Sequence, residues 1–276
     1  MTVPGVDAIV VFCPRPAPGT WASAVLRELA AHVEVRTCGP GWPARDLSGV
    51  DSARVRLLLE LDATPGCVAR PARVQGFDVP RAAWLVETSR KPDLHREIAR
   101  ECDLVFHAHP AWAAALGKPS SWLPLCADQE TFRPVEVERE WDVAFVGGDP
   151  WRADPLVALA KRRGLRVCVT SPEGPDAKAQ AAAVYARSKA IFHRHLTNAL
   201  DVRVLEGLSA GRVVLVDRRE NGLGALAEPG RQVLPYAGEA ELESMLLRLL
   251  GDDARRAELE RGEPSVSALE WRCSRR

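Results

Sequence analysis

The run from Asp201 to Asp217 constrains the fold more than any other part of the chain. Its first half has apolar residues at helical spacing, Gly211 follows where that helix would end, and residues 213–216 are typical of a short buried strand. Glu206 lies inside the predicted helix. Because an unpaired buried carboxylate is costly, Glu206 is predicted to have a hydrogen-bond donor as partner. The apolar positions of the helix are Val202, Leu205 and Leu208 or Ser209.

The first half of the chain alternates between strand and helix patterns. Thr20 is a plausible N-cap for the first helix, and proline begins each of the other two, where its missing N–H is not needed. We expect strands at 8–12, 33–37, 55–61, 82–86, 104–107 and 121–125, and helices at 21–31, 92–101 and 110–116.

The second half repeats this alternation after a charged stretch, residues 126–140, that lacks periodicity. The domain boundary is placed there, giving domains 1–138 and 139–276. Alternating strands and helices predict an α/β fold with two parallel sheets covered on both faces. The expected strands are 141–146, 166–170, 189–192, 213–216 and 232–235, and the expected helices are 152–163, 176–187, the Glu206 helix and 239–250.

Composition excludes several classes of protein. Lys plus Arg and Asp plus Glu both total 37 of the 276 residues, so the formal net charge is +0, which argues against nonspecific nucleic-acid binding. No apolar run approaches the roughly 20 residues of a membrane span, and the first residues do not read as a signal peptide, so we expect a cytoplasmic protein without stable membrane insertion. The 7 cysteines are scattered, which predicts reduced core thiols rather than a disulfide framework or zinc site.

Three spaced motifs resemble those of the CgeB-like (spore-maturation-type) bacterial glycosyltransferases. The family motif reads approximately Asn-x-Arg-x-Phe-Glu-Ala-x-Ala-x-Gly; Arg203, Glu206 and Gly211 match it, whereas Asp201 stands in for the Asn and Leu205 for the Phe. The two other matches are Trp122-Leu123-Pro124-Leu125-Cys126-Ala127-Asp128 and Asp142-Val143-Ala144-Phe145-Val146-Gly147.

The resemblance, clearest from about 82 to 262, implies the glycosyltransferase-B (GT-B) architecture: two Rossmann-like domains whose parallel sheets face each other across a cleft. It further implies that domain 139–276 binds a nucleotide-activated sugar, that domain 1–138 presents the acceptor, and that Glu206 holds the ribose hydroxyls of the donor. Retention of anomeric configuration is also implied. The acceptor itself, whether a small molecule, a glycan or a protein, cannot be read from the residues.

Candidate donor-binding residues follow the strands of the second domain, because ligands of open parallel sheets collect at the carboxyl ends of the strands. Gly147 and Gly148 would let backbone approach a phosphate, and Arg152, where the family carries an Arg, suits a diphosphate. His193 follows a strand as well. The alternatives are a tight turn for the glycines, a solvated Arg152 and a packed or solvated histidine.

Arg203 and Glu206 are one helical turn apart, so they could share a face and simply pair with each other. We favour donor binding, because the helix begins beside residues 193–198, at the edge where substrates gather.

Candidate catalytic residues are Glu87, His107 and Asn198. In related retaining enzymes a second Glu precedes the ribose-binding Glu by eight positions and contacts the transferred sugar; Asn198 occupies that position here. Glu87 and His107 follow first-domain strands and could orient an acceptor hydroxyl or take its proton. Asp62 and His109 are in similar positions, and each of these residues has a structural alternative as a loop cap or helix start.

The sequence therefore predicts a glycosyltransferase that needs no cofactor and takes a nucleotide-diphosphate sugar as its donor substrate. No Asp-x-Asp metal signature is persuasive, and Arg152, Arg203 and the helix dipole would neutralise the leaving diphosphate without a divalent metal. Two alternatives stay open: a nucleotide-sugar epimerase of the same fold, and a degenerate binding or partner protein. The second alternative is suggested by a chain that is short for this architecture. It is also suggested by residues 265–276, which lack a clear helix that could cross back to the first domain.

Overall fold

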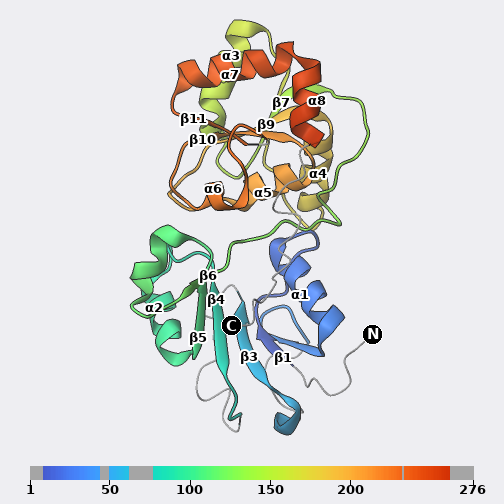
Figure 1. Ribbon diagram of the computed structural model, residues 1–276. Coiled ribbons are helices and arrows are strands. Elements are labelled where there is room, and N and C mark those ends of the chain that lie inside the picture. Colours follow the sequence, from blue (N-terminus) through green and yellow to red (C-terminus); the bar gives the residue numbers. More distant parts are fainter. Residues whose placement is uncertain (1–8, 44–49, 62–76, 232, 262–276) are drawn as a thin grey trace. The chain divides into compact units, whose positions relative to one another are not determined.

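The computed structural model describes residues 9–43, 50–61, 77–231 and 233–261, and it divides into two compact units. Unit 1 is Met1–Leu125 and unit 2 is Cys126–Arg276 (Figure 1). Asp62 and the end of the chain, residues 265–276, lie outside the described residues.

Unit 1 is a six-stranded parallel sheet with strand order β2-β1-β3-β4-β5-β6. Its core consists of two apolar clusters, one around Val10, Phe12 and Leu58 and the other around Leu85 and Ile98. The elements are β1 (Ile9–Phe12), α1 (Trp21–His32), β2 (Val35–Cys38), η1 (Ser52–Arg54), β3 (Leu57–Leu61), β4 (Arg81–Leu85), α2 (Pro92–Glu101), β5 (Leu104–His107), η3 (Pro110–Leu116) and β6 (Ser121–Trp122).

Unit 2 is a five-stranded parallel sheet with strand order β11-β10-β9-β7-β8. Its elements are β7 (Trp141–Val146), η4 (Pro150–Ala153), α3 (Asp154–Arg163), β8 (Val167–Thr170), α4 (Ala177–Ala186), β9 (Ser188–His193), α5 (Val202–Ser209), β10 (Val213–Asp217), α6 (Leu223–Leu226), β11 (Val233–Tyr236), α7 (Glu239–Gly251) and α8 (Asp253–Arg261).

Helices cover both faces of the unit 2 sheet (Figure 1). One face packs on α3, α7 and α8 through a cluster that includes Phe145, Leu156 and Leu246. On the other face α5 lies so close that a Cβ on Gly207 would meet Val214 at 3.1 Å. Because parallel strands alternate their side chains between two covered faces, most strand residues are apolar, which is the pattern that the sequence shows.

The strand order of each sheet creates a switch point. In unit 2 the chain goes from β7 out to β8 and then returns to the other side of β7 to form β9, so the segments that follow β7 and β9 leave the sheet in opposite directions. Such crevices, at the carboxyl ends of the strands, are where open α/β sheets bind ligands. Unit 1 has the same order, with its switch point between β1 and β3.

The end of α5 follows from its sequence. Gly211 has a φ of +70°, which glycine adopts without steric cost, and its N–H donates to Leu208 while Arg212 N–H donates to Gly207. This pair of bonds satisfies the last carbonyls of the helix and turns the chain directly into β10. The helix-to-strand unit expected from the sequence is therefore present.

Several expected elements differ in detail. Residues 110–116 form a 3-10 helix instead of an α-helix, and the expected helix 152–163 divides into η4 and α3. The strand expected at 121–125 ends at Trp122, and Pro124, which has no N–H for the ladder, lies just beyond it. Helices α6 and α8 were not expected at all.

The segment that follows Leu125 packs inside unit 2. The Phe132 and Tyr185 rings lie 5.9 Å apart, and Ser209 Oγ donates to Phe132 O at 2.5 Å. The boundary along the chain accordingly falls between Leu125 and Cys126, whereas the sequence places it at 138/139. Residues 126–138 lack helix or strand periodicity, so their pattern does not indicate which unit they join.

Candidate functional site

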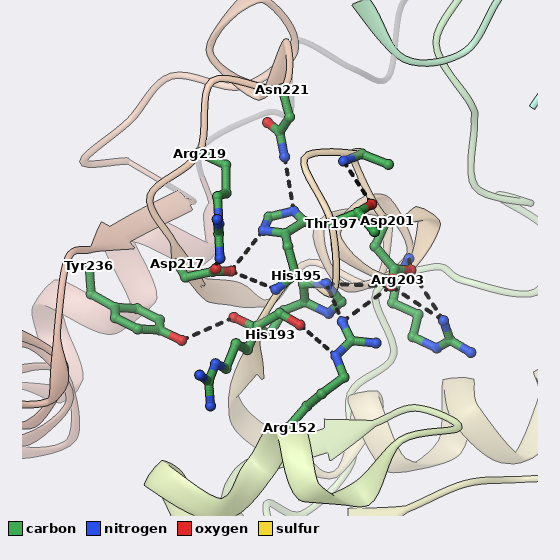
Figure 2. Close-up of polar contacts among 12 residues, drawn as sticks. Arg152, His193, His195, Thr197, Asp201, Arg203, Asp217, Arg219, Asn221 and Tyr236 are labelled. Atoms are coloured by element: carbon green, nitrogen blue, oxygen red, sulfur yellow. Dashed lines mark hydrogen bonds and ion pairs between the residues drawn. The ribbon is translucent and has the colours of Figure 1, made fainter. Parts of the chain in front are cut away.

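A cluster of buried charged and polar side chains lies at the switch point of unit 2 (Figure 2). We call Arg152, His193, Asp201 and Arg203 the switch-point cluster. Arg152 comes from η4 after β7, His193 ends β9, and Asp201 and Arg203 stand at the start of α5. The strand order thus brings together residues that are about 50 positions apart in the chain.

Arg152 lies at the centre of this cluster and is only 3% exposed. Its Nε donates to Arg194 O at 2.6 Å, and its Nη2 lies 3.0 Å from His193 Nε2 and 3.4 Å from Asp201 Oδ2. Its guanidinium carbon also lies 5.6 Å from the centre of the Phe145 ring. These contacts hold the guanidinium in one place, so Arg152 is not the solvated helix-start arginine of the alternative interpretation.

His193 is neutral in this environment. Burial lowers its pKa to about 3, and the nearby Arg152 and Arg203 act in the same direction. Because a guanidinium has only donors, Nε2 of His193 must accept the bond from Arg152, which places the ring proton on Nδ1. The imidazole therefore adds no charge to the cluster.

Asp201 caps α5 and also accepts from both arginines. Its Oδ1 accepts from Arg203 N–H at 3.1 Å and from Arg203 Nη1 at 3.2 Å. Burial alone would raise the pKa of Asp201, but the backbone bond and the charges of Arg203 and Arg152 hold it well below its usual range. The carboxylate is therefore ionised throughout the physiological pH range.

The charges of the switch-point cluster do not cancel. Arg152 and Arg203 each carry one positive charge, Asp201 carries one negative charge, and His193 is neutral, which leaves an excess of one positive charge. Arg203 is 33% exposed, so part of its guanidinium faces solvent. An anion that reaches this rim would meet a fixed, partly buried positive charge with hydrogen-bond donors.

The two glycines after β7 differ. A Cβ on Gly147 would lie 2.8 Å from the Phe145 ring, so packing alone accounts for this glycine. A Cβ on Gly148 would have nothing within 4 Å, and Gly148 is exposed. Since neither steric contact nor a positive φ accounts for glycine at position 148, Gly148 is the residue whose bare backbone is open to a ligand.

Glu206 is buried one helical turn inside α5, and its hydrogen-bond partner is Lys178 from the first turn of α4. The Glu206 side chain is 2% exposed and that of Lys178 is 23% exposed. Burial raises the pKa of Glu206, whereas the charges of Lys178 and Arg203 act in the opposite direction. The expected donor for Glu206 is therefore present, but it is Lys178, while Arg203 pairs with Asp201.

A second histidine stabilises the neighbouring loop. His195 N–H and Nδ1 both lie within hydrogen-bonding distance of Asp217 Oδ1, at 2.6 and 2.8 Å, and its Nε2 lies 3.0 Å from Asn221 Nδ2. Burial would raise the pKa of Asp217, yet these bonds and one from Arg219 hold it below its usual range. Asn198, in the exposed part of the same loop, donates to Glu220 O at 3.4 Å.

The unit 1 candidates have local partners. Glu87 lies 3.6 Å from Arg90 and 3.5 Å from Lys91, both close in sequence. His107 is buried, its Nδ1 lies 2.9 Å from Ser120 Oγ, and burial lowers its pKa. These contacts agree with the structural alternatives, and within unit 1 they do not bring Glu87 and His107 into one hydrogen-bonded group.

Two site residues, Lys178 and Asn221, were missed by sequence reasoning, and Asp201 was recognised only as a substitute for Asn. Helical spacing offered Arg203 as a partner for Glu206, and the predicted burial of Glu206 was the signal that a hydrogen-bond donor was needed. It could not identify Lys178, because nothing in helical periodicity relates positions 28 residues apart.

The chain matches the glycosyl transferase-like family over residues 129–276, more than half of its length. The protein therefore belongs to this family. The matched residues fall within unit 2, which contains the switch-point cluster and Glu206. No curated protein matches the chain.

Several solved structures share the fold at low sequence identity. Sucrose-phosphate synthase from Thermosynechococcus elongatus aligns with a TM-score of 0.63 at 15% identity, covering 95% of this chain and 94% of that chain. HepE from Anabaena, solved with UDP-glucose, aligns with a TM-score of 0.59 at 13% identity over 95% and 94%. A DNA-modifying β-glucosyltransferase, studied with and without uridine diphosphoglucose, gives 0.61 at 13% over 94% and 92%. The two parallel α/β sheets and these neighbours identify the GT-B glycosyltransferase fold.

The described residues lack two further features. None of their helices is both long and apolar enough to cross a membrane. Among the same residues, no three or more His, Cys, Asp or Glu side chains are grouped so that they could hold a metal ion.

Proposed function

We propose that the protein transfers a sugar from a nucleotide-diphosphate donor to an acceptor, and that unit 2 binds the donor at its switch point. The observation that carries the proposal is the unbalanced positive charge of the switch-point cluster at the carboxyl ends of β7 and β9. A diphosphate would supply the missing negative charge, and guanidinium groups suit its oxygens.

In the proposed donor geometry, the diphosphate and the ribose contact different residues of unit 2. The diphosphate lies against the open backbone of Gly148 and the exposed part of Arg203, while the buried Arg152 fixes Asp201 and His193 behind it. Glu206 accepts hydrogen bonds from the ribose hydroxyls. Uridine is the first base to test, since two structural neighbours were solved in studies with UDP-glucose.

Transfer proceeds, in this proposal, without a divalent metal, because the arginines stabilise the charge that develops on the leaving diphosphate. Retention of configuration and membership of the CgeB-like group rest on the motif that includes Arg203, Glu206 and Gly211. Asn198 would contact the transferred sugar as a neutral hydrogen-bonding group. The acceptor is assigned to unit 1, with Glu87 or His107 as candidate groups for its hydroxyl.

Nucleotide binding to the whole chain tests the donor site. UDP, GDP, ADP and their sugar conjugates are titrated calorimetrically into the wild type and Arg203→Ala. Loss of a charge-assisted hydrogen bond is worth roughly 1.5–3 kcal/mol, so Arg203→Ala should weaken the preferred nucleotide about 10- to 100-fold. Arg163→Ala is the matched control, because Arg163 forms a surface ion pair with Glu243 in the same unit. Equal affinities in all three proteins would refute the donor site.

Product analysis separates the competing functions. Incubation with a labelled donor and a panel of acceptors should give a labelled glycoside and free nucleotide. A labelled nucleotide sugar with an inverted carbon, formed without acceptor, would instead identify an epimerase. Binding without any turnover would identify a degenerate binding protein.

A further inference from the structure

The ion pair between Lys178 and Glu206 joins two helices across the face of the unit 2 sheet. Lys178 lies in the first turn of α4, and its ammonium donates to Glu206 Oε1 on α5. Both helices begin at the carboxyl edge of the sheet, where the chain leaves β8 and β9. The pair therefore lies near the same edge as the switch-point cluster.

The surroundings of Glu206 contain few charged groups. Arg203 and Asp201 at the start of α5 act on it electrostatically, as does Lys178 on α4. Tyr185, also on α4, is fully buried and neutral, because burial and Glu206 raise its pKa well above the usual value. On the outer side, the Lys178 ammonium lies 5.8 Å from the centre of the Phe132 ring. Lys178 is thus the cation in direct hydrogen-bonded contact with the Glu206 carboxylate.

Burial and the ammonium act on Glu206 in opposite directions. The carboxylate is removed from water, which favours its protonated form, and Lys178 favours its ionised form. Lys178 donates to Oε1, so it restricts the rotation of the carboxylate and leaves the second oxygen outside this bond. A protonated or rotated carboxyl would lose acceptor capacity toward a ligand hydroxyl.

We propose that Lys178 is a positioning residue for the donor: it keeps Glu206 ionised and oriented, so that the second carboxylate oxygen accepts a hydrogen bond from the ribose. This inference rests on the proposed function of Glu206. Lys178 itself need not touch the nucleotide, and its effect on the donor is transmitted through Glu206.

The pH dependence of UDP binding tests this role. The Kd is measured calorimetrically from pH 5.5 to 8.5 for the wild type, Lys178→Met, Lys178→Arg and Glu206→Gln. Dividing each variant Kd by the wild-type Kd at the same pH removes the titration of UDP itself. For Lys178→Met the ratio should be at least tenfold at pH 6 and fall as the pH rises, because Glu206 then ionises without help, until only the smaller, pH-independent cost of lost orientation is left. Lys178→Arg should stay within about threefold of the wild type throughout.

Other results would overturn the inference. A Lys178→Met ratio that is large but constant with pH means that Lys178 only contacts the phosphates or only supports the fold. A ratio near one at every pH means that Lys178 does not act on the donor. For Glu206→Gln we expect a weak affinity with a constant ratio, since the amide does not titrate in this range.

A measurement without nucleotide separates this inference from the proposed function. Carbon-13 labelling of glutamate side chains allows the carboxyl of Glu206 to be titrated by NMR, with Glu206→Gln identifying its signal. Its pKa should be higher in Lys178→Met than in the wild type, and an unchanged titration overturns the inference. If the wild type binds no nucleotide, the proposed function fails, whereas the carboxyl titration still decides whether Lys178 keeps Glu206 ionised.

Discussion

The two sheets have the same strand order at their switch points but carry different side chains at their carboxyl ends. In unit 2 these ends carry the switch-point cluster, with the buried Arg152 and His193 and the partly exposed Asp201 and Arg203. In unit 1 they carry indole rings. Five of the 8 tryptophans of the chain lie in or just after the strand ends of unit 1, namely Trp21, Trp42, Trp84, Trp112 and Trp122.

Three of the unit 1 indoles, those of Trp42, Trp84 and Trp122, donate hydrogen bonds to main-chain carbonyls. Trp42 Nε1 donates to Cys13 O at 3.1 Å, Trp84 Nε1 to Leu123 O at 2.9 Å, and Trp122 Nε1 to Ala108 O at 3.1 Å. The rings of Trp21 and Trp84 also pack edge to face, 5.2 Å apart. In such folds the topology sets where a ligand binds, whereas the side chains at that place set which kind of ligand is bound.

The strongest prediction compares two buried arginines: Arg152, which we propose supports donor binding, and Arg212, which supports only the fold. Arg212, like Arg152, is 3% exposed, but it bonds to the carbonyls of Tyr185, Gly211 and Val135 and pairs with Glu260 at 3.3 Å. Replacing either arginine by Ala should lower the free energy of unfolding by roughly 3–5 kcal/mol, because buried partners are left unpaired. Urea denaturation measures this loss.

Nucleotide affinity, measured at a temperature where both variants are folded, should fall only in Arg152→Ala. Arg152→Lys provides a milder test, since it keeps the charge and loses the fork of donors. If Arg212→Ala weakens UDP as much as Arg152→Ala does, the distinction between the two arginines is wrong.

A smaller effect concerns pH and stability. His193 has a folded-state pKa of about 3, below the ordinary value of 6.5, so the unfolded chain takes up a proton first as the pH falls. The stability that neutral His193 provides is present above pH 6.5 and declines below it, by up to about 1.4 kcal/mol per pH unit. Between pH 6 and 4.5 the wild type should therefore lose about 2 kcal/mol more than His193→Gln, which keeps an acceptor for Arg152. Parallel unfolding curves across this range would show that His193 is not buried as a neutral group.

The two glycines after β7 provide a matched pair. Gly147→Ala should cost roughly 1–3 kcal/mol of stability, because its Cβ would press on the buried Phe145 ring. Gly148→Ala should fold normally but bind UDP several-fold more weakly, since a methyl group would stand where the diphosphate approaches the backbone. Thermal denaturation and calorimetric titration distinguish the two. Undiminished affinity in Gly148→Ala would place the diphosphate away from this turn.

The smallest expected effect is in unit 1. Trp42 is partly exposed and has the Arg15 guanidinium 5.6 Å from its ring centre. If the indoles bind a flat face of the acceptor, Trp42→Phe should lower kcat/KM for the acceptor about fivefold, equivalent to roughly 1 kcal/mol. UDP affinity should not change. A variant that weakens UDP but leaves the acceptor kinetics intact would contradict the assignment of the two units.

Most secondary structure was predictable because buried parallel strands are short, continuous apolar runs. Helix α2, 92–101, and strand β5, 104–107, have the bounds that periodicity predicts, and Thr20 accepts from Ser23 N–H as an N-cap should. Helix α8 was not predictable by this route, since most of its residues are charged and Leu259 is its single buried residue.

The site was predictable as a region but not as a network. Strand ends located Arg152 and His193, because parallel topology collects such residues at one edge, and the motif located Arg203. Which side chains bond to one another was not predictable, because helical spacing describes only neighbours in one helix. It made Arg203 the natural partner of Glu206, yet the fold brings in Lys178 from α4 and leaves Arg203 to Asp201.

Asp201 has two roles that can be separated. As the N-cap it starts α5, and as a carboxylate it offsets part of the charge of Arg152 and Arg203. Asparagine caps helices about as well as aspartate, so exchanging one oxygen for an amide nitrogen would preserve the scaffold and remove the one negative charge that offsets the two arginines. If this rim binds the donor as proposed, one codon change would adjust how tightly the anion is retained and would trade capture of a scarce substrate against rapid release of a spent one.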